Sequence, residues 1–359
     1  MSRARTFADL ATASEAGSVA NRNMIINGDM AVAQRGVSKT GFDKDTSGLF
    51  HVVDRWGLDI GTTAGAFTVT QDTDNTAPFN EALKIATTTA DTSIAAGEYV
   101  LLHQSIEGAN CARMRKGNSD ASAITISFYV KGNAAATYGF GLRDTDNDRI
   151  YNDVFSVTTS WSRVVLTLPG DTNGEYLDQD ANSSLQMYIW LHAGSTYTGG
   201  TFSSKTWANR DNWNTTVNSS NTSILDGTSR TFFMTGVQME LGEVVTPFEH
   251  ESFGDNLAKC RRYYQKITSC NVRGNGTTGG VSFQQIDPMR ATPTMSLSGA
   301  VTLNNIGENN HVQSSADSTL STSSLEGVEF TLGNFSSITD NLIYGLRPQG
   351  EHIQLDAEI

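Results

Sequence analysis

The chain contains the run Ile124-Thr125-Ile126-Ser127-Phe128-Tyr129-Val130-Lys131, the cleanest alternation of apolar and more polar residues in the sequence. Successive side chains of a β-strand point to opposite faces, so a period of two indicates a strand with one face in a core. The run therefore predicts a half-buried strand. Its isoleucine, phenylalanine and valine side chains are expected to point inward.

Other short runs of the same kind lie on both sides of this strand, separated by clusters of Gly, Asp, Asn and Thr. Those with a shared apolar face are Phe67 and Val69; Leu83 and Ile85; Val164, Leu166 and Leu168; and Leu185, Met187, Ile189 and Leu191. The run Thr231 to Met239 begins apolar on both faces, which predicts a central strand. About eight strands over roughly 200 residues, with no helical period between them, predict a mostly β protein whose body, residues 23–252, is a jelly-roll β-sandwich.

The composition also favours sheets. The 359 residues include 33 Gly, only 6 Pro and 18% charged residues, which suits strands and turns better than surface helices. A chain of this length exceeds one usual domain, so two modules are expected. Its 25 Lys and Arg against 38 Asp and Glu give a net charge of −13, which repels phosphate and anionic lipid. No nucleic-acid partner is expected.

The sequence shows no sign of a membrane-spanning or disulfide-bonded protein. It has no run of about 18 apolar residues, and its first residues lack the apolar stretch of an export signal. We therefore expect no membrane insertion. The three cysteines, Cys111, Cys260 and Cys270, form no C-x-x-C pair, which argues against a disulfide framework or a zinc ribbon. Folding in a reducing cytoplasm is the expectation.

One stretch inside the chain has helical character, from Gly254 to Lys266. Asp255 lies near its start and cations follow toward its end, as the helix dipole favours, and Leu257, Cys260 and Tyr264 share a face. We expect a short helical connector over residues 253–268, followed by a second small β-sandwich module over residues 269–359. Residues 1–22, with helical spacing of Phe7, Leu10 and Ala11, are expected to form a separate N-terminal arm.

Several strings occur in a fixed order along the chain. They are NMIINGDM (residues 23–30), AQRG (33–36), VDRW (53–56), SFYVKG (127–132), WSR (161–163), QMELG (238–242), TPFE (246–249), CRRYY (260–264) and PMRATPT (288–294). In this order they resemble a family of bacteriophage tail-fibre, or receptor-binding, proteins. Each string alone is weakly specific, whereas their order over most of the chain is a strong signal.

The resemblance implies a structural protein of the virion tail, assembled in the host cytoplasm, with a jelly roll like that of carbohydrate-binding modules. It implies a homo-oligomer, most simply a trimer, whose N-terminal arm joins other phage tail proteins and whose body contacts a host-surface glycan. A structural adaptor or decoration protein without receptor binding is the alternative. A glycan depolymerase is a third, because two carboxylates suffice for that reaction. We expect no enzyme, since the six histidines are scattered and no H-E-x-x-H or G-x-S-x-G motif occurs.

The loop with Asp144, Asp146 and Asp148 has the alternating carboxylates of a calcium loop. An EF-hand is excluded, because Arg149 stands where that motif needs Gly and Phe155 where it needs Glu. A solvated turn is the favoured interpretation. A Ca²⁺ site that also uses distant groups stays open, and no other cofactor is expected.

The polar segment from Gly194 to Ser229 is long for a connection between strands. Its candidate glycan-binding residues are Tyr197, Trp207, Asn209, Arg210, Asp211 and Trp213. Sugar C–H faces stack on aromatic rings, while amide, carboxylate and guanidinium groups hydrogen-bond hydroxyls. Alternatively, Trp207 or Trp213 pins the segment onto the sandwich or a neighbouring subunit. Trp56 and Trp161 are instead expected in the core.

Overall fold

The computed structural model describes residues 22–46, 50, 52–305, 310–347 and 351–359. The chain divides into two compact units, Met1–Ser252 and Phe253–Ile359, which are treated separately below. The predicted N-terminal arm, residues 1–22, lies outside the described residues except for Arg22. Strands dominate the described part, and the predicted mostly β fold class is confirmed.

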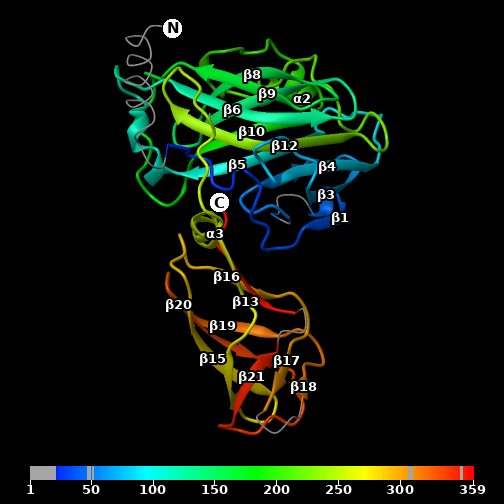
Figure 1. Ribbon diagram of the computed structural model, residues 1–359, viewed down its shortest axis with the longest axis vertical. Coiled ribbons are helices and arrows are strands. Elements are labelled where there is room, and N and C mark those ends of the chain that lie inside the picture. Colours follow the sequence, from blue (N-terminus) through cyan, green and yellow to red (C-terminus); the bar gives the residue numbers. More distant parts are fainter. Residues whose placement is uncertain (1–21, 47–49, 51, 306–309, 348–350) are drawn as a thin grey trace. The chain divides into compact units, whose positions relative to one another are not determined.

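The first unit is a sandwich of two six-stranded sheets (Figure 1). The first sheet has the order β1 (Ser38–Phe42), β3 (Ala66–Asp72), β4 (Ala82–Thr89), β12 (Thr231–Leu241), β6 (Ile124–Gly132) and β9 (Ser162–Leu168). The second has the order β11 (Trp207–Asn209), β8 (Arg149–Val157), β7 (Ala136–Asp144), β10 (Ser183–Ala193), β5 (Tyr99–Glu107) and β2 (Gly57–Ile60).

Every neighbouring pair in these two sheets is antiparallel. Strands that are far apart in sequence lie side by side at the centre: β12 between β4 and β6, and β10 between β7 and β5. Such crossovers between two packed sheets are typical of jelly rolls. The predicted jelly-roll body is confirmed, and the predicted central strand is β12.

The alternating run is strand β6, and its apolar residues fill the space between the sheets as predicted. Ile126, Phe128 and Val130 are each 0% exposed. The opposite face is not fully solvated, because the chain that follows β12 crosses one end of it. There Thr125 Oγ1 donates to the carbonyl of Gly242 at 2.7 Å.

The two tryptophans predicted to be core residues differ. Trp56 is 4% exposed, and its indole Nε1 donates to the carbonyl of Asn27 at 3.1 Å. Trp161 is only partly buried, so the prediction was wrong for this residue. It precedes β9 in phase with Val165, which is 43% exposed, whereas the alternate residues Leu166 and Leu168 point inward. Trp161 therefore lies on the outer face.

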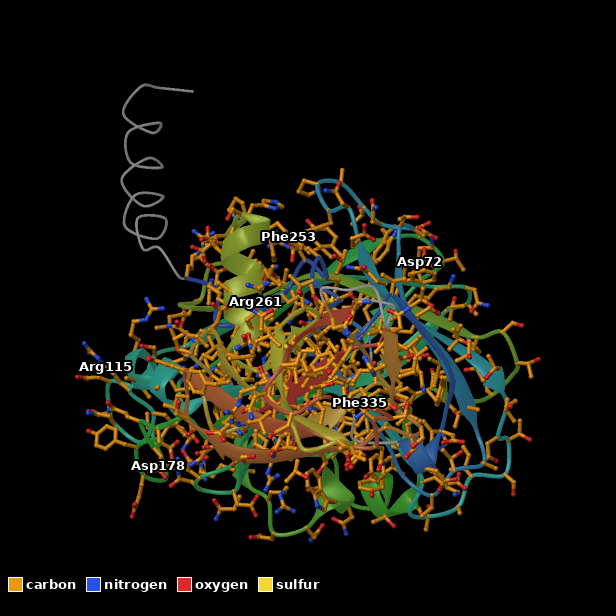
Figure 2. The ribbon with its side chains drawn as sticks, turned by 90° about the horizontal axis from the view of Figure 1, so that it is seen from below. Asp72, Arg115, Asp178, Phe253, Arg261 and Phe335 are labelled. Carbon is orange, nitrogen blue, oxygen red and sulfur yellow. The ribbon has the colours of Figure 1, made fainter. Side chains whose placement is uncertain are left out.

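The second unit begins with helix α3 (Phe253–Arg261), whose two end residues are labelled in Figure 2. The helix predicted over 254–266 was too long, and so was the helical connector to residue 268. Residues Tyr264–Ile267 form strand β13, which pairs with β22 (Ile353–Asp356). Pairing with a strand almost 90 residues away, which local charge patterns do not reveal, outweighs helix propensity here.

The second unit contains two sheets, as the predicted small β-sandwich module requires. The smaller has the order β13, β22 and β16 (Thr294–Leu297). The larger has the order β18 (Asn310–Val312), β17 (Thr302–Asn304), β21 (Ile343–Arg347), β14 (Asn271–Asn275), β15 (Gly279–Gln285), β20 (Gly327–Leu332) and β19 (Ser318–Ser323). One apolar cluster includes residues of both sheets, among them Val272, Phe330 and Leu355. None of the described helices has the length and apolar character needed to cross a membrane.

The two tryptophans give a test of this packing. Trp56→Ala should lower the free energy of unfolding by about 3–5 kcal/mol, because a large buried ring leaves a cavity. Trp161→Ala should lower it by less than about 1.5 kcal/mol, since part of that ring already contacts water. Chemical denaturation of the whole chain, followed by circular dichroism, measures both. Equal losses would contradict the assignment of Trp161 to the outer face.

Candidate functional site

The central strand β10 is buried on both of its faces. Its alternate residues Leu185, Met187, Ile189 and Leu191 lie in the main core and are each 0% exposed. The other face carries Tyr188 and Trp190, which are 5% and 2% exposed and belong to a separate apolar cluster on the outer side of the second sheet. This outer side therefore holds a second, aromatic layer.

Two glycines of β7 shape the floor of this layer. Gly139 pairs with Trp190 and Gly141 pairs with Tyr188, so neither ring has a side chain beside it on that strand. A Cβ atom at Gly139 would lie 3.3 Å from Cβ of Trp190, closer than an ordinary contact. The missing side chains give the aromatic rings their room.

The polar segment after β10 covers part of the layer. Helix α2 (Ser195–Thr198) carries Tyr197, and the short 3₁₀ helix η4 (Trp213–Thr215) carries Trp213. The ring centroids of Tyr197 and Trp213 lie 5.2 and 6.0 Å from that of Trp190. Val217, 0% exposed, fixes the segment onto the same cluster.

Between the floor and the covering segment lies a pocket of about 320 Å³. Both aromatic and hydrogen-bonding side chains line it. Its lining residues are Asp59, Tyr99, Leu101, His103, Arg143, Gln186, Tyr188, Trp190, Tyr197 and Trp213.

The polar groups of the pocket include both donors and acceptors. The hydroxyl of Tyr99 donates to Oδ2 of Asp59 at 3.2 Å, and the hydroxyl of Tyr188 donates to Oε1 of Gln186. Nε1 of Trp190 and Nδ1 of His103 are buried and have no hydrogen-bond partner within the described part of the chain.

Burial shifts the pKa values of two groups that line the pocket. Burial is the main cause that lowers the pKa of His103 to about 4. Burial, with a contribution from the nearby Asp59 carboxylate, raises the pKa of Tyr99 to about 12. At neutral pH the pocket therefore offers an uncharged imidazole and an uncharged phenol, both suited to neutral hydroxyl groups.

Arg210 supports the wall of the pocket without lining it. Its Nε and Nη2 donate to Oδ1 and Oδ2 of Asp148 at 2.7 and 2.6 Å, and its guanidinium lies 4.3 Å from the ring centroid of Trp213. Arg143 donates to the same carboxylate and lies 5.5 Å from that ring. Burial acts to raise the pKa of Asp148, but the two arginines outweigh it and lower the pKa.

Of the six candidate residues, the structure places Tyr197 and Trp213 in the pocket and the other four outside it. Trp207, on β11, donates from Nε1 to the carbonyl of Pro169 at 2.9 Å and packs against the main core, which is the pinning arrangement. Asn209 Oδ1 accepts from Nη1 of Arg149 at 2.7 Å. Asp211 is exposed to solvent.

The three aspartates of the predicted calcium loop have protein partners. Asp144 forms an ion pair with Lys116, and its Oδ1 accepts from the amide of Asp146 at 2.9 Å. Oδ2 of Asp146 accepts from the amide of Asp178 at 2.9 Å, and Asp148 binds the arginines described above. No cluster of three acidic, histidine or cysteine side chains suited to a metal occurs within the residues that the structure describes. The loop has the contacts of a structural turn.

Most of the pocket was missed from the sequence. The missed residues are Asp59, Tyr99, Leu101, His103, Arg143, Gln186, Tyr188 and Trp190. A signal existed in β10, where Gln186, Tyr188 and Trp190 alternate with the core residues. An outward face with two large aromatics is unusual for a solvated sheet surface and indicates that something covers it.

No family model matches the sequence, and no curated protein is significantly similar to it. Solved structures with a similar fold include a family 11 carbohydrate-binding module from Clostridium thermocellum in complex with a β-1,3-1,4-mixed-linked tetrasaccharide (12% identity, TM-score 0.28, 59% of this chain and 99% of that chain). A putative sugar binding protein from Bacteroides thetaiotaomicron is also similar (13% identity, TM-score 0.32, 61% and 99%). So is the enzymatically active domain of tailspike protein 4 of bacteriophage CBA120 (12% identity, TM-score 0.31, 61% and 21%).

His103 gives a test of the pocket's burial. Because its folded pKa lies below the usual value of about 6.5, the unfolded chain binds a proton first as the pH falls. The stability of the first unit should therefore decrease between pH 6.5 and 4, and His103→Gln should remove part of that decrease. The imidazole signals in a nuclear magnetic resonance titration should report a pKa of about 4 for His103. Titration near 6.5 would show that the ring is solvated.

Proposed function

We propose that the first unit binds a glycan in the pocket above β10 and acts by binding alone. The observation that carries the proposal is one continuous group of aromatic rings with polar groups at its edges. The rings are those of Tyr99, Tyr188, Trp190, Tyr197 and Trp213. Asp59, Gln186 and Arg143 supply the polar edge groups.

This combination matches the surface of a sugar. The C–H groups on one face of a pyranose ring pack against aromatic rings, while hydroxyls at the ring edge need both donors and acceptors. The volume of about 320 Å³ is at the lower end of ligand pockets, which span about 300–1,000 Å³. One or two sugar units would be enclosed, so we expect weak binding per site.

The lining favours binding over cleavage. Glycoside hydrolysis commonly uses two carboxyl groups that flank the scissile bond. Asp59 is the one carboxylate among the residues that line this pocket. A depolymerase thus stays the less favoured alternative, and release of reducing sugar from a bound polysaccharide would favour it.

We also propose that the protein belongs to a phage tail and attaches the virion to a host-surface glycan. The support is the ordered set of strings, whose residues contact one another. Asn27 Nδ2 donates to the carbonyl of Asp54 at 2.9 Å, and the amide of Asn23 donates to Oε2 of Glu249 at 2.6 Å. The amide of Glu249 donates to Oε1 of Gln238 at 2.7 Å. These contacts join the strings into one hydrogen-bonded unit. Such a unit fits a receptor-binding protein and a structural adaptor equally.

The pocket walls give a direct test of glycan binding. Trp213→Ala should weaken binding to envelope polysaccharide about fivefold or more, because one aromatic contact contributes on the order of 1 kcal/mol. Its melting temperature should fall less than that of Trp56→Ala, since the ring is only partly buried. Calorimetric titration and thermal unfolding of each variant measure the two effects.

Two matched tryptophan variants serve as controls for that experiment. Trp161→Ala removes a partly buried ring on the other sheet and should leave binding unchanged. Trp207→Ala should lower the melting temperature, because it removes the contact with Pro169 and the core. If Trp213→Ala binds as well as the unaltered chain, this pocket is not the glycan site.

An attachment protein with weak sites gains from several copies, because linked sites raise the apparent affinity without new contacts. We propose a symmetric homo-oligomer, most simply a trimer, joined to other tail proteins through residues 1–22. Native mass spectrometry at micromolar concentration should show three copies of the chain. A monomer as the sole species would contradict this proposal and would leave glycan binding by each chain unaffected.

A further inference from the structure

A second cavity, of about 570 Å³, lies at the opposite edge of the sandwich from β2. It is lined by residues of β8 and β9, including consecutive ones such as Asp153 to Ser156 and Ser162 to Thr167. β9 is the last strand of its sheet, and β11 pairs with β8 only at residues 149–151. The cavity therefore opens between two strand edges, and it shares no lining residue with the pocket above β10.

A buried carboxylate borders this cavity. Asp153 is 4% exposed, because it points inward in phase with the core residues Tyr151 and Phe155. Its Oδ1 accepts from the amide of Val154 at 2.8 Å. Its Oδ2 forms an ion pair with Nζ of Lys205, at a distance of 3.9 Å. This ion pair is too long for a direct hydrogen bond, so a cation that comes closer to Oδ2 would bind more strongly.

Lys205 shows that an ammonium can approach Asp153 from solvent. Its side chain is 69% exposed, whereas that of Asp153 is 5% exposed. An ion pair with such an exposed, flexible partner is weak and easily exchanged. Lys205 thus behaves as a loosely held cation at the mouth of the cavity.

The other cation that lines the cavity, Arg163, forms its contacts with groups outside the cavity. Nη2 of Arg163 donates to Oγ of Ser127 at 3.0 Å and to the carbonyl of Thr246 at 2.8 Å. Its guanidinium also lies 5.7 Å from the ring centroid of Tyr129. Arg163 is therefore fixed toward the outer face of the first sheet.

We propose that this cavity is a second binding site, for an amino sugar with a free primary ammonium group. The ligand's ammonium replaces that of Lys205 and hydrogen-bonds Oδ2 of Asp153 at close range, which the long ion pair does not achieve. The hydroxyl of Ser162, which is on the inward face of β9 with Val164 and Leu166, pairs with a sugar hydroxyl. The volume accommodates a hexosamine unit.

Two variants with opposite expected effects test the site, with the methyl glycoside of glucosamine as the probe and the full chain as the protein. Asp153→Asn keeps the shape of the side chain and should weaken binding roughly tenfold or more, because a hydrogen bond to a charged group is lost. Lys205→Met removes the competing cation and should strengthen binding about twofold to fivefold, the range of an exposed ion pair. Calorimetric titration measures both affinities.

Two further probes define the chemistry. The N-acetylated glycoside, which has no ammonium, should not bind. Nα-acetyl-lysine amide carries the same ammonium without the sugar and should bind far more weakly, so equal binding would overturn the assignment to an amino sugar.

Unchanged affinity in Asp153→Asn, or weaker affinity in Lys205→Met, would show a purely structural ion pair and overturn the proposal. Lys205 is exposed, so that variant keeps the test valid even if Asp153→Asn unfolds. Trp213→Ala should leave this binding unchanged, which separates the outcome from that at the other pocket.

Discussion

The structure of the first unit depends on the need to bury the two aromatic rings on the outer face of β10. A strand at the centre of a sandwich sheet needs one apolar face for the core, yet β10 carries Tyr188 and Trp190 on its other face as well. Exposing both rings to water would cost several kcal/mol. The chain covers them with the segment that follows the strand, and a pocket of about 320 Å³ stays between this segment and the sheet.

The cover is held by contacts that do not touch the pocket. Arg149 links Asp171 to Asn209, with its Nε 2.7 Å from Oδ2 of Asp171. Lys116 pairs with Asp144 and lies 3.5 Å from the same oxygen of Asp171. Such buried ion networks contribute little net stability, but breaking one partner is costly, so they fix the position of the loops that they join. A wall fixed before a ligand arrives loses little conformational entropy on binding.

The sequence predicts the parts of this structure that depend on local periodicity. The period of two in β6 locates the core, and the polar composition of residues 194–229 locates Tyr197 and Trp213. It fails where a distant partner decides the outcome. The end of α3 depends on the pairing of Gln265 with Leu355, and the floor of the pocket depends on Gly139 and Gly141 lying beside Trp190 and Tyr188. The two large aromatics on the outer face of β10, Tyr188 and Trp190, indicate burial but do not show what covers them.

The aromatic layer above β10 is proposed to be a sugar-binding surface. A crystal structure of the chain soaked with oligosaccharides of a host-envelope polysaccharide is the direct test. The claim predicts a sugar ring packed against Trp213 and Tyr197, with ring hydroxyls within hydrogen-bond distance of Asp59 or Gln186. A saccharide bound elsewhere on the chain, with the pocket above β10 left without sugar, would contradict it.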